Sequence, residues 1–255
     1  MKINPLVAKL SHFAVLSAEE IALLESLCVN EESFPAHVDI VTEGQVPRSP
    51  FVLTDGLACR YRVLRDGRRQ ILTFLVPGDT SNLHGFLIQA MDHSIATLMP
   101  TRIAMVQWEI VMGITTGYPR LGGALWWSAL QEEAIMRERI VSIGRRSARG
   151  RIAYLLCEFV WRQRAVGLSN DDEIRLPLTQ TELGDAAGLT SVAVNRALQD
   201  FRRNGWIKFS RGRLTLLATE KLLDIAQFSQ RYLHLDGAPT PIRRYFDQLD
   251  RAGGA

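Results

Sequence analysis

The sequence predicts an α+β protein built from three parts: an amino-terminal β-roll of the jelly-roll-like, double-stranded β-helix kind, a long dimerisation helix, and a carboxy-terminal winged helix-turn-helix. Short apolar runs separated by evenly spaced glycines fill the first part. A helical repeat of apolar residues follows Pro119, and two capped helices with a basic hairpin come last. The expected segments are 1–118, 119–146, 147–218 and a helical extension, 219–255.

Length and composition are those of a globular protein. The 255 residues are 47% hydrophobic and 22% charged, enough for two domains that each bury a core. No apolar run approaches the ~18 residues that cross a bilayer, so we expect a cytoplasmic protein with no membrane partner. Cys28, Cys59 and Cys157 form no C-x-x-C pair, which predicts buried thiols and neither disulfides nor a zinc site.

Charge is divided unevenly along the chain, whose net charge is +3. Residues 144–213 hold 13 Lys and Arg against 7 Asp and Glu, a net charge of +6, which leaves −3 for the rest. A basic module attached to a mildly acidic one indicates that only the basic module meets a polyanion.

The β-roll follows a short helix that opens at Ser17 with a capping box. From Phe34 onward, short apolar or alternating runs predict strands, and glycines recur between them at intervals of 12, 11 and 11 residues from Gly44 to Gly78. Turns at such regular spacing predict a β-barrel or sandwich. The predicted strands are Asp39–Thr42, Phe51–Thr54, Ala58–Leu64, Gln70–Val76, Ser94–Leu98 and Arg102–Gln107.

A helical period begins after Pro119, with one stripe at alternating three- and four-residue steps. We expect one face of this helix to pack on the β-roll and the other on a partner subunit; the alternative is a helix that packs only on its own β-roll. Gly144–Gly150 predicts a hinge, Ile152–Arg164 another helix and Val166–Glu173 a polar loop. The predicted dimerisation residues are Trp126, Ala129, Glu133, Met136, Ile140 and Ile143.

A helix-turn-helix is predicted between Leu178 and Arg203. Thr179 opens the first helix with a capping box, Gly188 turns the chain, and Thr190 caps the second helix. The stripe of the second helix expected in the core is Val194, Ala197, Leu198 and Phe201. The opposite stripe is either an ordinary solvated face or a reader of base edges in a DNA major groove, and its members are Ser191, Val192, Asn195, Arg196 and Gln199.

A β-hairpin wing is predicted next, from the strand-like runs Trp206–Ser210 and Arg213–Leu217 around a glycine turn. Its basic residues Lys208, Arg211 and Arg213 suit DNA phosphates, which set affinity and register without reading sequence. This context favours DNA binding over a merely solvated helix face.

The order of these elements resembles the Crp/Fnr superfamily of bacterial transcription regulators over roughly residues 10–218. The stretch LPLTQTELGDAAGLTSVAVNRALQDFRRNGWI is similar to that family's helix-turn-helix, and VPGD at Val76–Asp79 to the turn before its ligand-binding segment. The resemblance implies a homodimer on an inverted repeat in double-stranded DNA, control through the β-roll, and contact with RNA polymerase if the regulator is an activator. It gives backbone anchoring to Thr179, Gln180 and Thr181, and base readout to Ser191, Val192, Asn195 and Arg196.

Two of the residues expected to read bases depart from the family members that bind a G-T-G-A half-site. Those members have Arg and Glu where this chain has Ser191 and Val192, although Arg196 is retained. We therefore expect a different half-site.

The expected effector segment departs further from the family's cyclic-AMP-binding members. Their pocket has the form PGD-x-x-GE followed by Arg-Ser, and this chain has Asn82, Leu83 and His93 in place of the Gly, the Glu and the Arg. Imidazole cannot give the two parallel hydrogen bonds of a guanidinium, so we do not expect cyclic AMP to bind in this mode. The pocket candidates are Asn82, Leu83, His84, Gly85, His93 and Ser94.

Other cofactors have less support. An iron–sulfur cluster needs several amino-terminal cysteines, and Cys28 is alone there. His84 and His93 lie in the pocket segment, but we expect ordinary histidines there and no haem or metal ligands. An unknown small-molecule effector and DNA binding without any effector both stay open.

Two other classes of function are alternatives. An enzyme would need an H-x-H metal motif, a G-x-S-x-G elbow, a P-loop or a G-x-G-x-x-G loop, and the sequence has none of these, so we expect no enzyme. A sensory or scaffold protein whose winged helix binds another protein stays open, although Asn195, Arg196 and the basic wing favour DNA.

Overall fold

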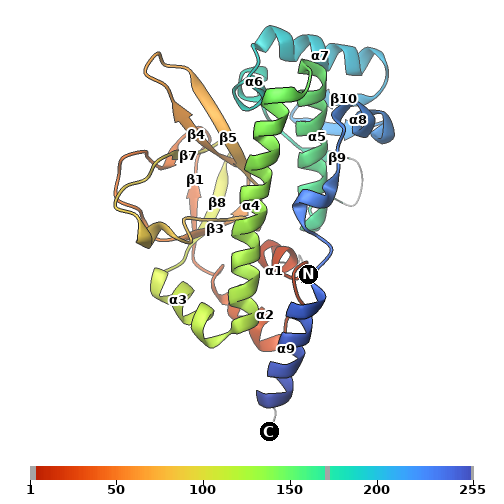
Figure 1. Cartoon of the computed structure of the whole chain (residues 1–255). Coiled ribbons are helices and arrows are strands. Elements are labelled where there is room, and N and C mark those ends of the chain that lie inside the picture. The colour runs from red at the N-terminus through yellow and green to blue at the C-terminus, as the bar shows by residue number, and fades with distance from the viewer. Residues whose placement is uncertain (1–3, 170–172, 254–255) are drawn as a thin grey trace.

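The computed structural model describes residues 4–169 and 173–253. A β-roll lies beside the long helix α4 (Pro119–Arg145), α5 (Ala148–Ala165) runs back next to α4, and the winged helix-turn-helix lies at the far end of α4 (Figure 1). None of the helices in these residues is both long enough and apolar enough to cross a membrane.

Two four-stranded antiparallel sheets form the described β-roll, in the orders β1-β8-β3-β6 and β2-β7-β4-β5. Apolar side chains such as Phe51, Leu53 and Ile95 are buried between them. Gly56 has a φ of +101°, and a side chain there would lie 2.5 Å from Thr101 Oγ1, so this turn requires glycine. The strands are β1 (Glu31–Phe34), β2 (Asp39–Val41), β3 (Phe51–Asp55), β4 (Ala58–Val63), β5 (Arg69–Leu75), β6 (Thr80–Ser81), β7 (Ser94–Thr97) and β8 (Thr101–Met105).

All six predicted strands are confirmed to within two residues, as β2, β3, β4, β5, β7 and β8. The sequence does not predict β1 and β6, because β1 has a mostly polar sequence and β6 is only two residues long. The cysteines differ in burial: Cys59 and Cys157 are buried as predicted, whereas Cys28 is half-buried.

Short helices flank the β-roll at both ends of its sequence, and one short 3-10 helix, η1, lies within it between β6 and β7. The predicted capping box of α2 is confirmed, with Ser17 N donating to Glu20 Oε2 at 2.7 Å and Glu20 N donating to Ser17 Oγ at 3.2 Å. The sequence does not predict α1 or α3. These elements are α1 (Pro5–Leu10), α2 (Ala18–Ser26), η1 (Gly85–Leu87) and α3 (Trp108–Gly117).

The predicted hinge at Gly144–Gly150 is much shorter in the structure. Helix α4 continues to Arg145, Arg146 and Ser147 alone are outside a helix, and Ser147 Oγ accepts from Gly150 N at 3.2 Å to cap α5. Arg146 is also tied down, because its Nε donates to Ala226 O at 2.9 Å. The connection between α4 and α5 is therefore shorter and better fixed than the hinge predicted from Gly144 and Gly150.

The winged domain contains the predicted helices α6 and α7 and a three-stranded sheet in the order β10-β11-β9. Strand β9 corrects one prediction, because Glu173 pairs with Thr215 of β11 and so ends the expected polar loop early. Residues 170–172 of that expected loop lie outside the described residues. The elements are β9 (Glu173–Arg175), α6 (Gln180–Ala187), α7 (Ser191–Arg203), β10 (Ile207–Ser210) and β11 (Arg213–Leu216).

The winged domain shares a core with the β-roll, although the sequence predicts a separate core for each. The rings of Phe74 on β5 and Phe159 on α5 have centroids 4.8 Å apart, and one cluster of buried side chains runs from β4 and β5 through α5 into α7. The cause is α5, whose apolar side chains are buried all round and not on one face.

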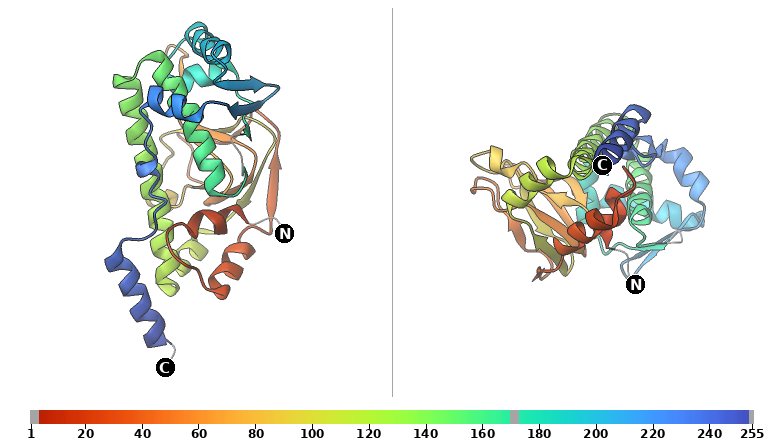
Figure 2. Two further views of the ribbon diagram at one scale, coloured as in Figure 1. Left: turned by 90° about the vertical axis from the view of Figure 1, so that its right-hand side faces the viewer. Right: turned by 90° about the horizontal axis from the view of Figure 1, so that it is seen from below.

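The carboxy-terminal extension returns along α4 to the amino-terminal helices (Figure 2). Trp127 Nε1 donates to His234 O at 3.1 Å, and Ala238 N donates to Phe13 O at 2.7 Å. The short helix expected after Gly237 is α9, and its Phe246 ring packs edge-on against Phe13 with centroids 6.1 Å apart. The extension contains α8 (Thr219–Ala226), η2 (Gln230–Leu233) and α9 (Thr240–Gly253).

Candidate nucleic-acid interface and sensor pocket

The first helix of the helix-turn-helix, α6, begins with the predicted capping box. Glu182 N donates to Thr179 Oγ1 at 3.1 Å, and Thr179 N donates to Glu182 Oε2 at 2.7 Å. Gly184 lets the two helices approach, because a side chain there would lie 2.5 Å from Leu189 O. Local sequence therefore fixes both the start of α6 and its contact with the next turn.

The recognition helix α7 is divided into two faces as the sequence predicts. Thr190 caps it by accepting from Ala193 N at 3.2 Å. Val194, Ala197, Leu198 and Phe201 are buried. The opposite stripe, called here the outer face of α7, is exposed and contains Ser191, Val192, Asn195, Arg196 and Gln199.

The residues expected to anchor DNA lie beside the outer face of α7. Thr179 and Thr181 are exposed, and Gln180 is half-buried. Gln180 Nε2 donates to Asn195 Oδ1 across the turn at 3.4 Å. This bond orients the Asn195 amide, a contact that spacing along one helix does not reveal.

The wing has the predicted two-residue turn, formed by Arg211 and Gly212 with φ values of +51° and +70°. Lys208 and Arg211 are exposed. Arg213 differs from the expectation that it suits phosphates, because its Nη1 lies 2.8 Å from Glu173 Oε1. That hydrogen bond lowers the pKa of Glu173 and pairs the charge of Arg213, whereas Lys208 and Arg211 form no ion pair with the described residues.

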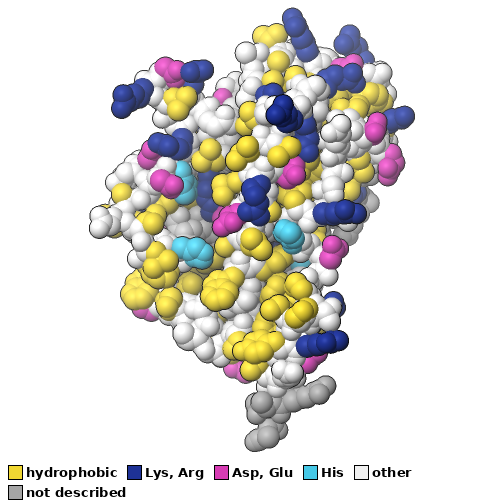
Figure 3. Space-filling view, in the orientation of Figure 1, with side chains coloured by type: hydrophobic (Ala, Val, Ile, Leu, Met, Phe, Trp, Pro, Cys, Tyr) yellow, Lys and Arg dark blue, Asp and Glu magenta, His cyan; other side chains and the backbone are white. Residues whose placement is uncertain are grey.

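The space-filling view shows several Lys and Arg side chains around the end of the molecule that α6 and α7 form (Figure 3). Hydrophobic side chains instead gather lower down, over α3 and α4. Basic side chains also lie elsewhere on this face, but those at the helix-turn-helix end surround the recognition helix.

A buried ion network fastens α5 to the β-roll. Asp79 Oδ1 lies 2.6 Å from Lys9 Nζ, and Asp79 Oδ2 lies 2.5 Å from Arg162 Nη2. Burial alone would raise the pKa of Asp79, but the charges of Lys9 and Arg162 outweigh it and hold that pKa below its usual value. Asp79 belongs to the VPGD turn, so this turn anchors the winged domain, a role the sequence analysis missed.

A second contact joins β5 to α6. Arg69 Nε donates to Asp185 Oδ2 at 2.8 Å, and Gln70 Nε2 donates to Asp185 O at 2.7 Å. This contact joins the β-roll to the helix-turn-helix, because Asp185 lies on α6, the first helix of that motif. Its partners come from more than 100 residues away, which no local pattern encodes.

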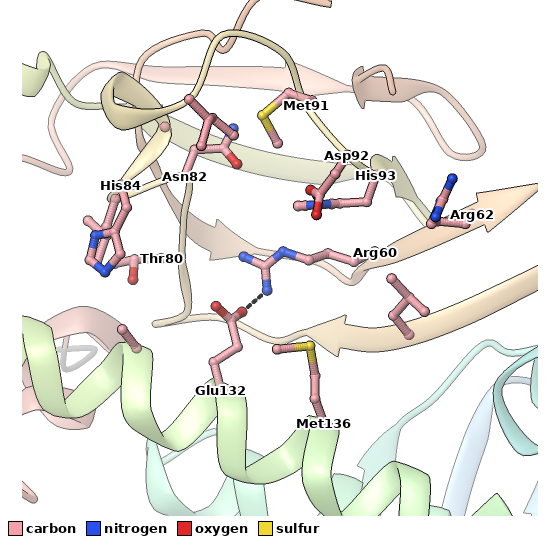
Figure 4. A pocket seen from close by; sticks show the side chains of 15 residues that line it. Arg60, Arg62, Thr80, Asn82, His84, Met91, Asp92, His93, Glu132 and Met136 are labelled. Carbon is pink, nitrogen blue, oxygen red and sulfur yellow. Dashed lines mark hydrogen bonds and ion pairs between the residues drawn. The ribbon is translucent and has the colours of Figure 1, made fainter. Parts of the chain in front are cut away.

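A cavity of about 360 Å³ lies between the β-roll and α4 (Figure 4). Five of the six predicted pocket residues line it: Asn82, Leu83, His84, Gly85 and His93. Ser94 does not, because it is buried elsewhere with its Oγ accepting from Glu43 N at 2.9 Å. No three His, Cys, Asp or Glu side chains gather to hold a metal ion in the described parts of the chain.

Arg60 and Glu132 are the charged pair of this cavity, and the sequence analysis missed both. Arg60 extends from β4 to meet the Glu132 carboxylate on α4 (Figure 4). Its other terminal nitrogen donates to Ser81 Oγ at 3.0 Å. Burial lowers the pKa of Arg60 to about 10, so the guanidinium still carries its charge at neutral pH.

Two buried polar atoms at the cavity have no partner among the described residues: Asn82 Nδ2 and His93 Nε2. The other ring nitrogen of His93 lies 2.7 Å from Asp92 Oδ1. Burial lowers the pKa of His93, so the ring is neutral at neutral pH and its Nδ1 carries the proton that Asp92 accepts. His93 Nε2 is then an acceptor and Asn82 Nδ2 a donor.

The predicted dimerisation stripe is divided among three surroundings. Trp126 and Ile140 are 68% and 72% exposed, and Glu133 is exposed beside them. Ala129 and Met136 instead line the cavity. Ile143 packs near Gly188 of the helix-turn-helix, within 3.5 Å of where a side chain on that glycine would begin. Helix α4 has different neighbours on its several sides, so residues of one sequence stripe do not all face the same surroundings.

Comparisons with known proteins place these features in one family. A Crp-like helix-turn-helix domain matches residues 150–225, and a cyclic nucleotide-binding domain matches residues 31–115. The structure of FixK2 from Bradyrhizobium japonicum has a similar fold, with a TM-score of 0.69 at 23% identity, covering 78% of this chain and 98% of that one.

Two relatives are similar in sequence over most of their length. The nitrogen fixation regulation protein FixK of Azorhizobium caulinodans is 26% identical over 195 residues, 74% of this chain and 76% of that protein. The transcriptional activator protein FnrL of Cereibacter sphaeroides is 30% identical over 194 residues, 74% of this chain and 77% of that protein. This chain belongs to the Crp/Fnr family of DNA-binding transcription regulators.

Proposed function

We propose that the protein binds an inverted repeat in DNA as a homodimer, and that an effector other than cyclic AMP controls it through the β-roll. The observation that carries this proposal is the outer face of α7. Arg196 and Asn195 are exposed there with polar heads suited to guanine and adenine edges. The exposed Lys208 and Arg211 lie on the neighbouring wing, where phosphates can fix the register.

The dimer is supported by the exposed side of α4. Trp126, Leu130, Ile140 and Val141 are large apolar side chains on one helix, and all are exposed. Exposed apolar side chains at both ends of one helix suit an interaction site, with the exposed Glu133–Arg137 ion pair between them, and a two-fold axis lets the same helix face pack on itself. Two recognition helices related by such an axis suit half-sites about one DNA turn apart.

An effector other than cyclic AMP is supported by the cavity beside α4. Leu83 lies where cyclic-AMP-binding relatives are expected to hold the ribose, and it packs against the apolar cluster of the amino-terminal helices. His93 cannot replace a guanidinium at the cyclic phosphate. The residues therefore do not fit a cyclic nucleotide, and a molecule of other chemistry suits this cavity better.

Control through the β-roll is supported by the contacts between the two domains. Asp79 joins α5 to the β-roll, and Asp185 joins α6 to β5. A change in the angle between α4 and the β-roll would strain both contacts and move α7. In the alternative without any effector, these contacts would hold one fixed DNA-binding geometry.

Activation is the direction of control that the comparisons favour, because FnrL is named as a transcriptional activator. An activator of this kind is expected to contact RNA polymerase from its bound site. In vitro transcription with purified polymerase on the selected operator tests this: a rise in transcript supports activation, and a fall shows repression.

Selection of binding sites from random duplex DNA, with the mass of the bound complex, tests the main proposal. We expect an enriched inverted repeat held by two copies of the chain. Arg196→Ala serves as the matched variant and should lose preference at one base pair of each half-site. Enrichment of an asymmetric site bound by one copy would contradict the dimer, and no enrichment with or without cell extract would favour a protein-binding role for the winged helix.

A further inference from the structure

The cavity beside α4 combines an apolar body with one buried cation. Its volume of about 360 Å³ suits a small organic molecule, and most of its wall is hydrocarbon. The apolar wall comes from strands, loops and α4 alike: Leu72, Leu83, Ile88, Met91, Ala129 and Met136. A ligand that fits must therefore be largely apolar.

Arg60 supplies the cation. Its side chain is 8% exposed and extends across the cavity toward α4 (Figure 4). Two other charged groups at the wall have closer partners of their own. Arg62 lies 2.7 Å from Glu43 in an ion pair, and Asp92 accepts a hydrogen bond of 2.7 Å from His93. Among the described residues, Asp79 and Asp92 act on the charge of Arg60 without an ion-pair contact to it, so Glu132 is the carboxylate in direct contact with the guanidinium.

Glu132 is a replaceable partner. Its side chain is 30% exposed, so water can solvate the carboxylate when it turns away from Arg60. Arg60 has no such option, because a buried guanidinium left without a counter-charge pays its full desolvation cost. When Glu132 turns away, Arg60 loses the carboxylate in direct contact with it, and the carboxylate of a ligand can take that place.

Polar atoms of the cavity limit the ligand further. Among the described residues, Asn82 Nδ2 is a buried donor without a partner, and His93 Nε2 is a buried acceptor without one. A ligand that meets both needs an acceptor oxygen and a hydroxyl or N–H group. A phosphate dianion suits the site less well, because a second buried cation is absent from the residues that line the cavity.

We propose that the effector is a monocarboxylic acid with an apolar body and a hydroxyl or N–H group, and that its carboxylate replaces that of Glu132 on Arg60. This inference rests on the proposed control through the β-roll and names the chemistry of that control. Replacement breaks the ion pair between β4 and α4 and leaves Glu132 in solvent. It therefore acts on the helix that carries both the exposed apolar stripe and the link to α5.

Competition between the ligand and Glu132 gives a direct test. The probes are 4-hydroxybenzoate and 4-hydroxyphenylacetate, each compared with its neutral amide, and cyclic AMP as a third chemistry. Calorimetric titration into the full chain should detect both acids and neither amide. Glu132→Gln removes the competing charge and should bind the acids at least tenfold more tightly, whereas Arg60→Met should abolish binding.

Controls keep the result decisive. Glu109→Gln removes an exposed carboxylate of α3 and should bind the acids as the unmodified chain does. Equal affinity of Glu132→Gln and the unmodified chain, binding of the amides as tight as that of the acids, tighter binding of cyclic AMP, or no acid binding by either protein would each overturn the proposal. Enrichment of an inverted repeat in the DNA selection, together with any of these results, would leave DNA binding intact and reject only the acid.

Discussion

The winged domain presents two faces that differ in what their polar side chains contact. On the outer face of α7, Asn195 and Arg196 are exposed, and Asn195 accepts a long hydrogen bond of 3.4 Å from Gln180. On the inner face, Arg162 is buried against Asp79 of the β-roll. The outer face keeps its hydrogen-bonding groups for another molecule, and the inner face uses them to set where the outer face points.

The two faces also differ in how stability responds to substitution. An exposed side chain without protein partners can change with little effect on folding. A buried charge cannot, because loss of its partner leaves it desolvated and unpaired. Substitutions on the inner face should therefore alter stability, and those on the outer face should alter DNA binding alone.

Asp79→Asn gives the largest expected effect, because it removes the carboxylate from the buried cations Lys9 and Arg162. Breaking a buried ion pair from one side costs about 3–5 kcal/mol, and we expect the free energy of unfolding to fall by that amount. Urea unfolding followed by tryptophan fluorescence measures it. Asp66→Asn, which removes an exposed carboxylate paired with Arg68, is the control, and an equally small change in both variants would contradict the role given to Asp79.

Asp79 also predicts how stability depends on pH. Its pKa is lowered in the folded chain, so its contribution is present above the ordinary carboxyl value, about 3.9, and is lost as pH falls through the lower folded value. The difference in unfolding free energy between the unmodified chain and Asp79→Asn should be constant from about pH 7 to 5 and shrink below about pH 4. Urea unfolding at each pH provides the measurement, and a difference that grows on acidification would have the wrong sign.

Arg196→Ala tests the outer face. It should weaken operator binding by about 1–3 kcal/mol and relax specificity at one base pair, because a bidentate contact to guanine is lost. The free energy of unfolding should stay within about 0.5 kcal/mol, since the side chain is exposed. Fluorescence anisotropy on operator variants measures the first effect and urea unfolding the second. Lys221→Ala on α8 is the matched control, and equal losses for both variants would remove Arg196 from base readout.

The outer face could be predicted from sequence because its pattern is local. Val194 and Ala197 are buried while Asn195 and Arg196 are exposed, and a period of 3.6 residues is enough to separate them. The capping box at Thr179 is equally local. Residues within one helix carry all the information that these predictions use.

The inner face and the cavity could not be predicted in the same way. Arg60 meets Glu132, and Asp79 meets Arg162, only after distant segments pack together. Asn82 and His93 line the cavity, and the sequence analysis chose them only through the resemblance to a family. Ser94 shows the limit of that transfer, because its hydroxyl caps a neighbouring backbone amide instead of facing the cavity.

Lys208→Ala and Arg213→Ala give the smallest effects and separate charge that is available to DNA from charge that is already paired. Lys208 is exposed on the wing, whereas Arg213 lies 2.8 Å from Glu173. Each phosphate contact contributes about 0.9 to the slope of log affinity against log salt, so Lys208→Ala should lower that slope by about this amount and weaken all sequences alike. Arg213→Ala should lower it less, because Glu173 already offsets that charge. Anisotropy titrations at several salt concentrations measure both slopes, and a larger change for Arg213 would mean that DNA binding breaks its pair with Glu173.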